Sequence, residues 1–207
     1  METQAAIDLV TGLQKEDTVV FLVSGGGSAL FESPLISGED LAGLTRQLLA
    51  CGADIVEMNT IRKRMSRVKG GKFAQLCAPA QVYAIVLSDI LGDPLDMIAS
   101  GPAYPDRSTR EDAWAVVKKY GLELTEEMKS LLDVETPKQL DNVETVITGS
   151  VRELCEAAAG ACREKGYETV VLTDLLCCQA REAGSFLASI AKSHENSDRS
   201  LAFLAGG

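Results

Sequence analysis

The feature that most constrains the fold is a short apolar run that ends in three consecutive glycines. Residues Val19 to Val23 are apolar and mostly β-branched or aromatic, without alternating polar residues. This pattern predicts a strand buried on both faces of a parallel sheet. The loop that follows contains Ser24, Gly25, Gly26, Gly27 and Ser28. Because glycine has no Cβ, such a loop can bring its N–H groups close to an anion. A plain structural turn between strand and helix is the alternative.

Overall composition limits the classes of partner. The 207 residues are 46% hydrophobic, which is enough for a packed core, and the formal net charge is −10. This acidic balance argues against nucleic-acid partners and acidic membranes, because phosphate contacts require clustered cations. No apolar stretch approaches the roughly 20 residues of a membrane span, and the first residues carry no basic targeting segment. We therefore expect a cytoplasmic protein with neither nucleic-acid nor membrane partners.

The six cysteines follow no Cys-x-x-Cys spacing, and the single histidine, His194, lies in a polar segment. Disulfide, zinc and histidine-based catalytic interpretations therefore have little support. We expect reduced and mostly buried thiols.

Basic residues are concentrated between positions 62 and 72, a segment that holds six of the chain's 20 Lys and Arg and no acid. A helix over Ile55 to Val68 would bury the stripe formed by Ile61, Met65 and Val68. The polar stripe beside it would consist of Arg62, Ser66 and Lys69. Aligned cations repel one another, so an anion or acidic neighbours must compensate them. The segment therefore indicates either an anion site or a solvated basic face paired with surface carboxylates.

Two further signals lie close to this segment. Gly70 and Gly71 precede a short helix predicted over Lys72 to Cys77, so backbone donors and side-chain charges converge there. A second buried strand, predicted over Val82 to Leu87, is followed by Asp89 and Asp93. Carboxylates beyond the carboxyl end of a parallel strand are typical Mg²⁺ ligands. Asp93 also has a structural interpretation, as the cap of a helix that starts at Pro94.

The remaining pattern predicts an α/β fold with an open, mostly parallel, Rossmann-like sheet flanked by helices. Residues 1–137 would form the first domain and 138–142 a linker. The segment 143–207 would begin a second α/β domain, with strands at 145–148, 169–172 and 201–204 and helices at 151–165 and 179–191.

Several motifs together resemble one known family. They are Ser24-Gly-Gly-Gly-Ser-Ala-Leu30, Asn59-Thr-Ile-Arg-Lys63 with Ser66 and Lys69-Gly-Gly71, Ser88-Asp89 with Gly92-Asp93, and Ile98-Ala-Ser-Gly-Pro102 with Pro105-Asp106. In this order and spacing they resemble the glycerate 2-kinases, also called MOFRL-type glycerate kinases. The resemblance implies transfer of the γ-phosphoryl group of ATP to D-glycerate with Mg²⁺, giving 2-phosphoglycerate, in a cleft between two α/β domains.

The resemblance also implies which residues form the site. Carboxylate or phosphate oxygens would be held by Ser24, Gly25, Gly26, Gly27, Ser28, Asn59, Arg62, Lys63, Ser66, Lys69, Gly70 and Gly71. Asp89 and Asp93 would hold the metal. Glycine-rich loops, cations and metal-bound carboxylates suit phosphoryl transfer, which depends on positioning and charge neutralisation.

The chain departs from the family in two respects. Arg64 stands where the family commonly has a histidine, and the family's N-terminal lysine region and later MOFRL arginine motif have no counterpart in these residues. We therefore expect part of a longer kinase that is inactive by itself. The alternative is a non-catalytic, anion- or metabolite-binding regulatory α/β module, and a homodimer stays open as an assembly.

Overall fold

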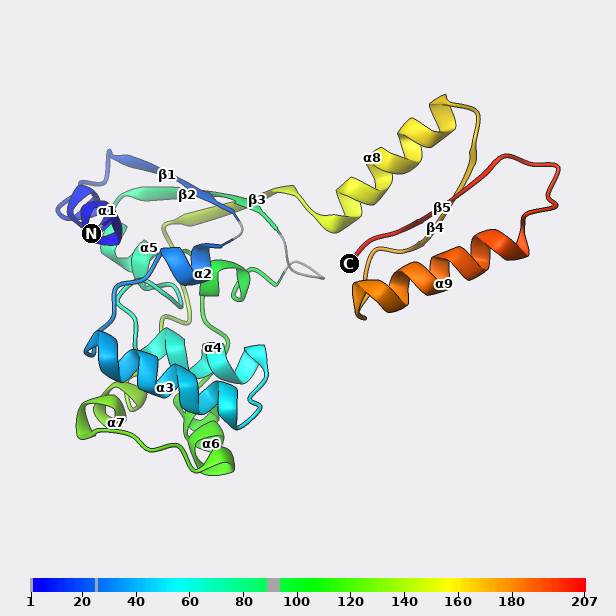
Figure 1. The fold of residues 1–207 in the computed structure, drawn as a ribbon. Helices are drawn as coiled ribbons and strands as arrows, with labels where there is room; N and C mark the ends of the chain where they lie inside the picture. Colours follow the sequence, from blue (N-terminus) through cyan, green and yellow to red (C-terminus); the bar gives the residue numbers. More distant parts are fainter. Residues whose placement is uncertain (1, 25, 89–93) are drawn as a thin grey trace. The chain divides into compact units, whose positions relative to one another are not determined.

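The computed structural model describes residues 2–24, 26–88 and 94–207. The chain divides into two units (Figure 1), one formed by Met1–Val86 and Pro94–Val146 and the other by Leu87–Asp93 and Ile147–Gly207. The helices of the first unit are α1 (Glu2–Val10), α2 (Gly27–Leu30), α3 (Gly38–Ala50), α4 (Ile55–Arg64), α5 (Lys72–Cys77), the 3₁₀ helix η1 (Ile98–Ser100), α6 (Arg110–Tyr120) and α7 (Glu126–Leu132).

The first sheet is parallel, as the sequence predicted. Strand β1 (Thr18–Val23) pairs with β2 (Gln81–Leu87), and Val20 lies opposite Tyr83. Strand β3 (Val143–Gly149) completes the order β1-β2-β3. The Val82 N–H donates to Asn142 O and the Ser88 N–H to Gly149 O, so β2 and β3 advance in the same direction.

Within residues 2–24, 26–88 and 94–207, one face of this sheet is buried and the other is exposed. The residues Val82 and Ala84 pack with Phe73 and Cys77 of α5 and Ile7 of α1 in one core cluster. On the opposite face Val20 is 63% and Leu22 73% exposed. The prediction that β1 is buried on both faces was therefore wrong for the described chain. An uninterrupted apolar run does not reveal how many layers cover it, because both faces carry the same residue types.

A second cluster of the first unit joins four helices. Helices α3, α4, α6 and α7 lie together in the first unit (Figure 1). Their apolar side chains form the core of the cluster, including Leu44, Leu48, Ile61, Val116 and Leu132. The side chain of Ser37 caps α3 by accepting the Asp40 N–H. This cluster holds α4, the helix that begins the basic segment.

The helix predicted over Ile55 to Val68 is shorter than expected. Helix α4 ends at Arg64, and Ser66 instead forms an antiparallel bridge with Pro34. The predicted apolar stripe of Ile61, Met65 and Val68 is nevertheless fully buried. Burial of that stripe was predicted correctly, but Ser66 and Lys69 do not continue a helical face beside it.

The second unit contains α8 (Val151–Glu164), β4 (Glu168–Thr173), α9 (Ala180–Ser193) and β5 (Leu201–Ala205). Strands β4 and β5 are parallel, with Glu168 opposite Leu201. These elements match the predicted helices and strands between 151 and 204. The strand predicted at 145–148 lies in β3, which belongs to the sheet of β1 and β2 and not to that of β4 and β5.

All six cysteines are free, as expected, but only Cys77 and Cys155 are buried, while Cys177 and Cys178 are exposed. The expectation of mostly buried thiols was therefore wrong. Burial raises the pKa of the Cys77 thiol to about 11. In the described part of the chain, no helix combines the length and apolar character needed to cross a membrane.

Candidate functional site

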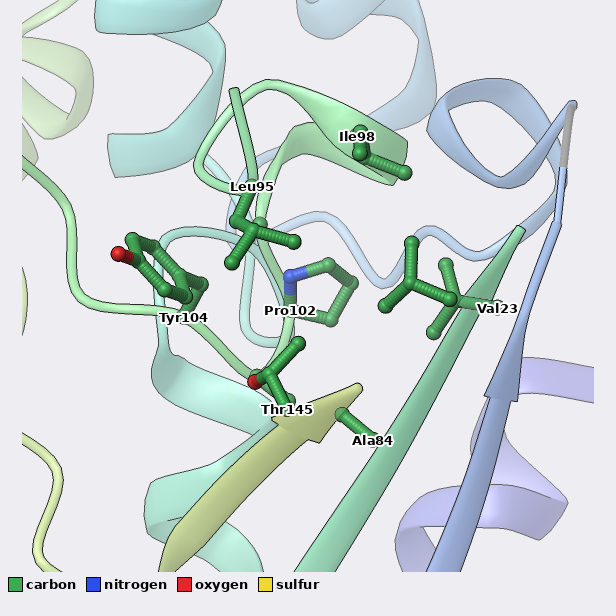
Figure 2. Close-up of a pocket in the computed structure, with 10 residues that line it drawn as sticks. Val23, Ala84, Leu95, Ile98, Pro102, Tyr104 and Thr145 are labelled. Atoms are coloured by element: carbon green, nitrogen blue, oxygen red, sulfur yellow. The ribbon is translucent and has the colours of Figure 1, made fainter. Parts of the chain in front are cut away.

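Two loops meet beyond the carboxyl ends of β1 and β2. One is the glycine loop, which continues into α2, and the other is the segment Ile98–Pro102. Figure 2 shows Val23, Ala84 and Thr145 on the sheet side of a small apolar cavity, with Leu95, Ile98, Pro102 and Tyr104 on the other side. The cavity has a volume of about 20 Å³. Apolar contacts therefore seat the 98–102 loop on the end of the sheet.

The 98–102 loop contains three successive left-handed residues. Ala99, Ser100 and Gly101 have φ angles of 51°, 62° and 63°. Non-glycine residues adopt this region only when surrounding structure holds them there, and such strain is concentrated at functional sites. Here the holding groups are Gly70 and Gly71, whose N–H groups donate to Ser100 O at 3.0 Å and Gly101 O at 2.7 Å. The two glycines thus fix the loop through their N–H groups.

A chain of polar side chains links this loop to the glycine loop. The Ser100 Oγ lies 3.0 Å from Asn59 Oδ1 and 3.3 Å from Ser28 Oγ. A hydroxyl has one proton, so if Ser100 donates to Asn59, Ser28 donates to Ser100. Asn59 is 4% exposed, and its Nδ2 lies 3.8 Å from Met97 Sδ, a weak acceptor. Ser28, Asn59 and Ser100 therefore form one polar group within the first unit.

Three basic side chains of the 62–72 segment make buried internal contacts. Lys63, 2% exposed, donates to Asp106 at 3.0 Å, and Arg64, 1% exposed, donates to Ser108 Oγ and Ser108 O. Lys72 Nζ donates to the backbone oxygens of residues 63, 64 and 66, just where α4 ends. Burial lowers the pKa of Lys72 to about 8. The interpretation as a solvated basic face does not hold for these three.

Asp106 is the counter-charge of this buried group. Besides Lys63, it accepts hydrogen bonds from the Thr136 hydroxyl and from the N–H and hydroxyl of Ser108. Burial acts to raise the pKa of Asp106, but the Lys63 charge and these hydrogen bonds outweigh it and hold the pKa below its ordinary value.

Lys69 and Arg62 instead lie at the glycine loop. Lys69 is fully buried, and its Nζ donates to Ser28 O at 2.6 Å. The same nitrogen lies 3.5 Å from Glu32 Oε2, and Arg62 Nη2 lies 3.8 Å from that oxygen. Burial lowers the pKa of Lys69, and the carboxylate of Glu32 acts against that shift. Ser66 is also buried, and its Oγ accepts the Val68 N–H.

The remaining site predictions fall into two groups. Ser24 and Gly26 lie in the glycine loop itself, Ser24 exposed and Gly26 with a left-handed φ of 86°, and Gly27 begins α2. Gly25, Asp89 and Asp93 lie outside the described residues, so the proposed metal ligands have no geometry to report. Among the described residues, no cluster of three or more His, Cys, Asp and Glu side chains could hold a metal ion.

Comparison with known proteins places the chain in a family. The family model described as "Domain of unknown function (DUF4147)" matches residues 1–133. The chain belongs to the DUF4147 family. D-glycerate 2-kinase of Thermotoga maritima is 52% identical over 201 residues, which cover 96% of this chain and 48% of that protein. A protein of Agrobacterium vitis, provisionally named a hydroxypyruvate reductase, is 40% identical over 89% of this chain and 43% of its own length.

A solved structure agrees with this assignment. The crystal structure of glycerate kinase from Thermotoga maritima matches with a TM-score of 0.92 and 50% identity, over 100% of this chain and 51% of that one. This DUF4147 chain thus spans about half the length of the curated relatives it matches. The resemblance to glycerate 2-kinases read from the sequence is confirmed.

Several residues of the polar network were absent from the predicted site, among them Glu32, Lys72, Ser100 and Asp106. Ser100 and Asp106 stand in motifs that carried the family resemblance, so the motifs could have identified them. Glu32 gave no signal, because its role depends on contacts with Lys69 and Arg62. Lys72 was counted only as part of the basic segment, because its role depends on the carbonyl oxygens at the end of α4.

Proposed function

We propose that this chain forms the substrate- and phosphate-binding part of a glycerate kinase that transfers the γ-phosphoryl group of ATP to D-glycerate, giving 2-phosphoglycerate. The observation that carries the proposal is the convergence of Ser28, Asn59, Ser100 and Lys69 beyond the carboxyl ends of β1 and β2. In open α/β sheets this is where ligands bind. The similarity to a protein named D-glycerate 2-kinase supports the choice of substrate.

In this proposal the site residues have different roles in binding, positioning and charge neutralisation. Ser24, Ser28 and the glycine loop hold oxygen atoms of the ligand, and Asn59 and Ser100 fix the loop's position. Lys69 and Arg62 provide positive charge, while Lys63, Ser66, Gly70 and Gly71 support the segment that carries them. Asp89 and Asp93 supply hard oxygen donors of the kind that suits Mg²⁺. When bound, the metal would neutralise charge on the phosphate oxygens.

The test is a coupled assay on the full-length protein with D-glycerate and ATP. Formation of 2-phosphoglycerate, identified by mass spectrometry and nuclear magnetic resonance, is the expected result. Binding of anions without transfer would instead favour the regulatory module. Reduction of hydroxypyruvate by a nicotinamide cofactor without phosphoryl transfer would favour the chemistry suggested by the name of the Agrobacterium relative.

Replacing Lys69 tests the basic segment. We expect Lys69→Ala to lower kcat/KM by about 10²-fold, because a preorganised donor and charge next to the glycine loop are lost. Lys69→Met preserves most of the side-chain volume and controls for packing. Lys129→Ala, at a half-exposed position on α7, is the matched loss of charge and should leave kinetics unchanged. Full activity in both Lys69 variants would remove this residue from the site.

A further inference from the structure

Glu32, Arg62 and Lys69 form a buried charge group whose hydrogen bonds are incomplete. Glu32 Oε2 and Arg62 Nε are shielded from solvent and have no hydrogen-bond partner among the described residues. Lys69 has three N–H donors and uses one of them on Ser28 O. Glu32 Oε2 has the ion pairs with Lys69 and Arg62, but buried polar groups are normally satisfied, so the unpaired donor at Arg62 Nε indicates a missing acceptor. An oxyanion supplies acceptors of this kind.

The group can be reached from solvent on one side. The side chain of Arg62 is 21% exposed and that of Glu32 13% exposed, whereas Lys69 is completely covered. An entering anion would therefore contact Arg62 directly. Lys69 would act chiefly through its charge and its hydrogen bond to the glycine loop.

The charge count limits which anion fits. Arg62 and Lys69 contribute two positive charges, and Glu32 removes one, which leaves a net charge of +1 beside the glycine loop. Lys72, a neighbouring cation, keeps its own positive charge, which is partly offset because it donates to three backbone oxygens at the end of α4, where the helix dipole is negative. Glu32 repels any entering anion, and because Coulomb energy scales with ligand charge it disfavours a dianion about twice as strongly as a monoanion.

We propose that Glu32 is a specificity-determining residue that makes the Arg62–Lys69 pair select a monoanionic carboxylate over a dianionic phosphate. This inference rests on the proposed function, because it assigns the pair to the hydroxy-acid carboxylate. Glu32 also positions the cations, with Oε1 held by the Ser33 N–H and Oε2 facing Lys69 and Arg62. Burial lowers the pKa of Lys69, and the Glu32 carboxylate opposes that shift.

The experiment compares affinities for two anions in the full-length protein at neutral pH without nucleotide. The probes are D-glycerate, a monoanion, and inorganic sulfate, a dianion at any pH near neutrality. Isothermal titration calorimetry gives both dissociation constants for the wild type, Glu32→Gln and Glu32→Asp. Because Coulomb energy scales with ligand charge, Glu32→Gln should strengthen sulfate binding more than glycerate binding, changing their affinity ratio by about tenfold towards sulfate. Glu32→Asp keeps the charge and should restore the wild-type ratio.

The matched control is Glu135→Gln, which removes the same charge from a carboxylate 3.6 Å from Arg64 Nη2. Its ratio should stay at the wild-type value. If Glu32 had only a structural role, Glu32→Gln would weaken the binding of both anions equally, so an unchanged affinity ratio overturns the proposal. Wild-type protein that binds neither anion also overturns it. The kinase assay is separate. A shifted affinity ratio in a protein without kinase activity would support the role of Glu32 and refute the proposed function. Phosphoryl transfer together with an unchanged affinity ratio would support the proposed function and refute the role of Glu32.

Discussion

Replacement of Asp106 by Asn is expected to lower the free energy of unfolding by about 3–5 kcal/mol, since one partner of a buried ion pair is removed. Asp106 is 1% exposed, and its carboxylate faces Lys63 at 3.0 Å and Arg64 at 3.9 Å. Among the described residues, the neutral amide would leave the buried Lys63 and Arg64 with only the carboxylates of Asp96 and Glu135, each at 3.6 Å. Urea unfolding of the full-length protein, followed by circular dichroism, measures the change. If the loss were under about 1 kcal/mol, a level typical of exposed pairs, the buried network would not have the importance assigned to it.

A matched variant separates burial from charge. Glu111→Gln also removes one carboxylate charge, but Glu111 is exposed and pairs with the exposed Arg110. We expect no measurable change in its unfolding midpoint. A similar loss of stability in both variants would show that overall charge, and not the buried network, is responsible.

The same carboxylate gives the fold a dependence on acid. The pKa of Asp106 is lower in the folded chain than in the unfolded chain, although burial alone would raise it. Its stabilising contribution is therefore complete above the unfolded value of about 4 and is lost as pH falls through the lower, folded value. We expect the difference in stability between wild type and Asp106→Asn to shrink below about pH 4. A difference that stayed constant down to pH 3 would contradict this assignment.

The second large effect is expected at Gly27. A Cβ added there would lie 2.6 Å from the Cβ of Ala99, closer than real contacts allow. Gly27→Ala should therefore push the glycine loop away from the 98–102 loop and disturb the contact between Ser28 and Ser100. Because displacements of about 1 Å in a positioned site can cost about 10²-fold, we expect a loss of this size in kcat/KM.

Gly43→Ala provides the control. Gly43 lies within α3, where the nearest atom to an added Cβ is the flexible end of Arg46 at 3.8 Å. We expect this variant to gain roughly 0.5–1 kcal/mol in stability, because alanine has the higher helix propensity, with unchanged kinetics. Wild-type kinetics in Gly27→Ala would show that the two loops do not have to approach so closely for activity.

Local sequence patterns predicted the elements well because each pattern had a local cause. The apolar runs at Val19–Val23 and Val82–Leu87 form parallel strands. The motifs around Ser28, Asn59 and Ser100 also identified the family, and the structure brings these three side chains into one network.

Contacts across long sequence separations could not be predicted in this way. Helix α4 ends at Arg64 although the apolar stripe continues, because Ser66 pairs with Pro34 and Lys72 binds the freed carbonyl oxygens. The charge of the basic segment suggested a surface or an anion site. Lys63 and Arg64 instead make internal contacts with Asp106 and Ser108. These partners lie more than 40 residues away in the chain, so no local pattern could indicate them.

The half-covered sheet also affects the tendency of this chain to self-associate. Val20 and Leu22 present an apolar strip to water, while the net charge of −10 makes neighbouring molecules repel one another. That repulsion reaches about 10 Å at 0.1 M salt but only about 3 Å at 1 M. The colloidal stability of this chain therefore depends on ionic strength. Charge repulsion prevents association through the apolar strips in dilute buffer, and concentrated salt screens this repulsion and permits association.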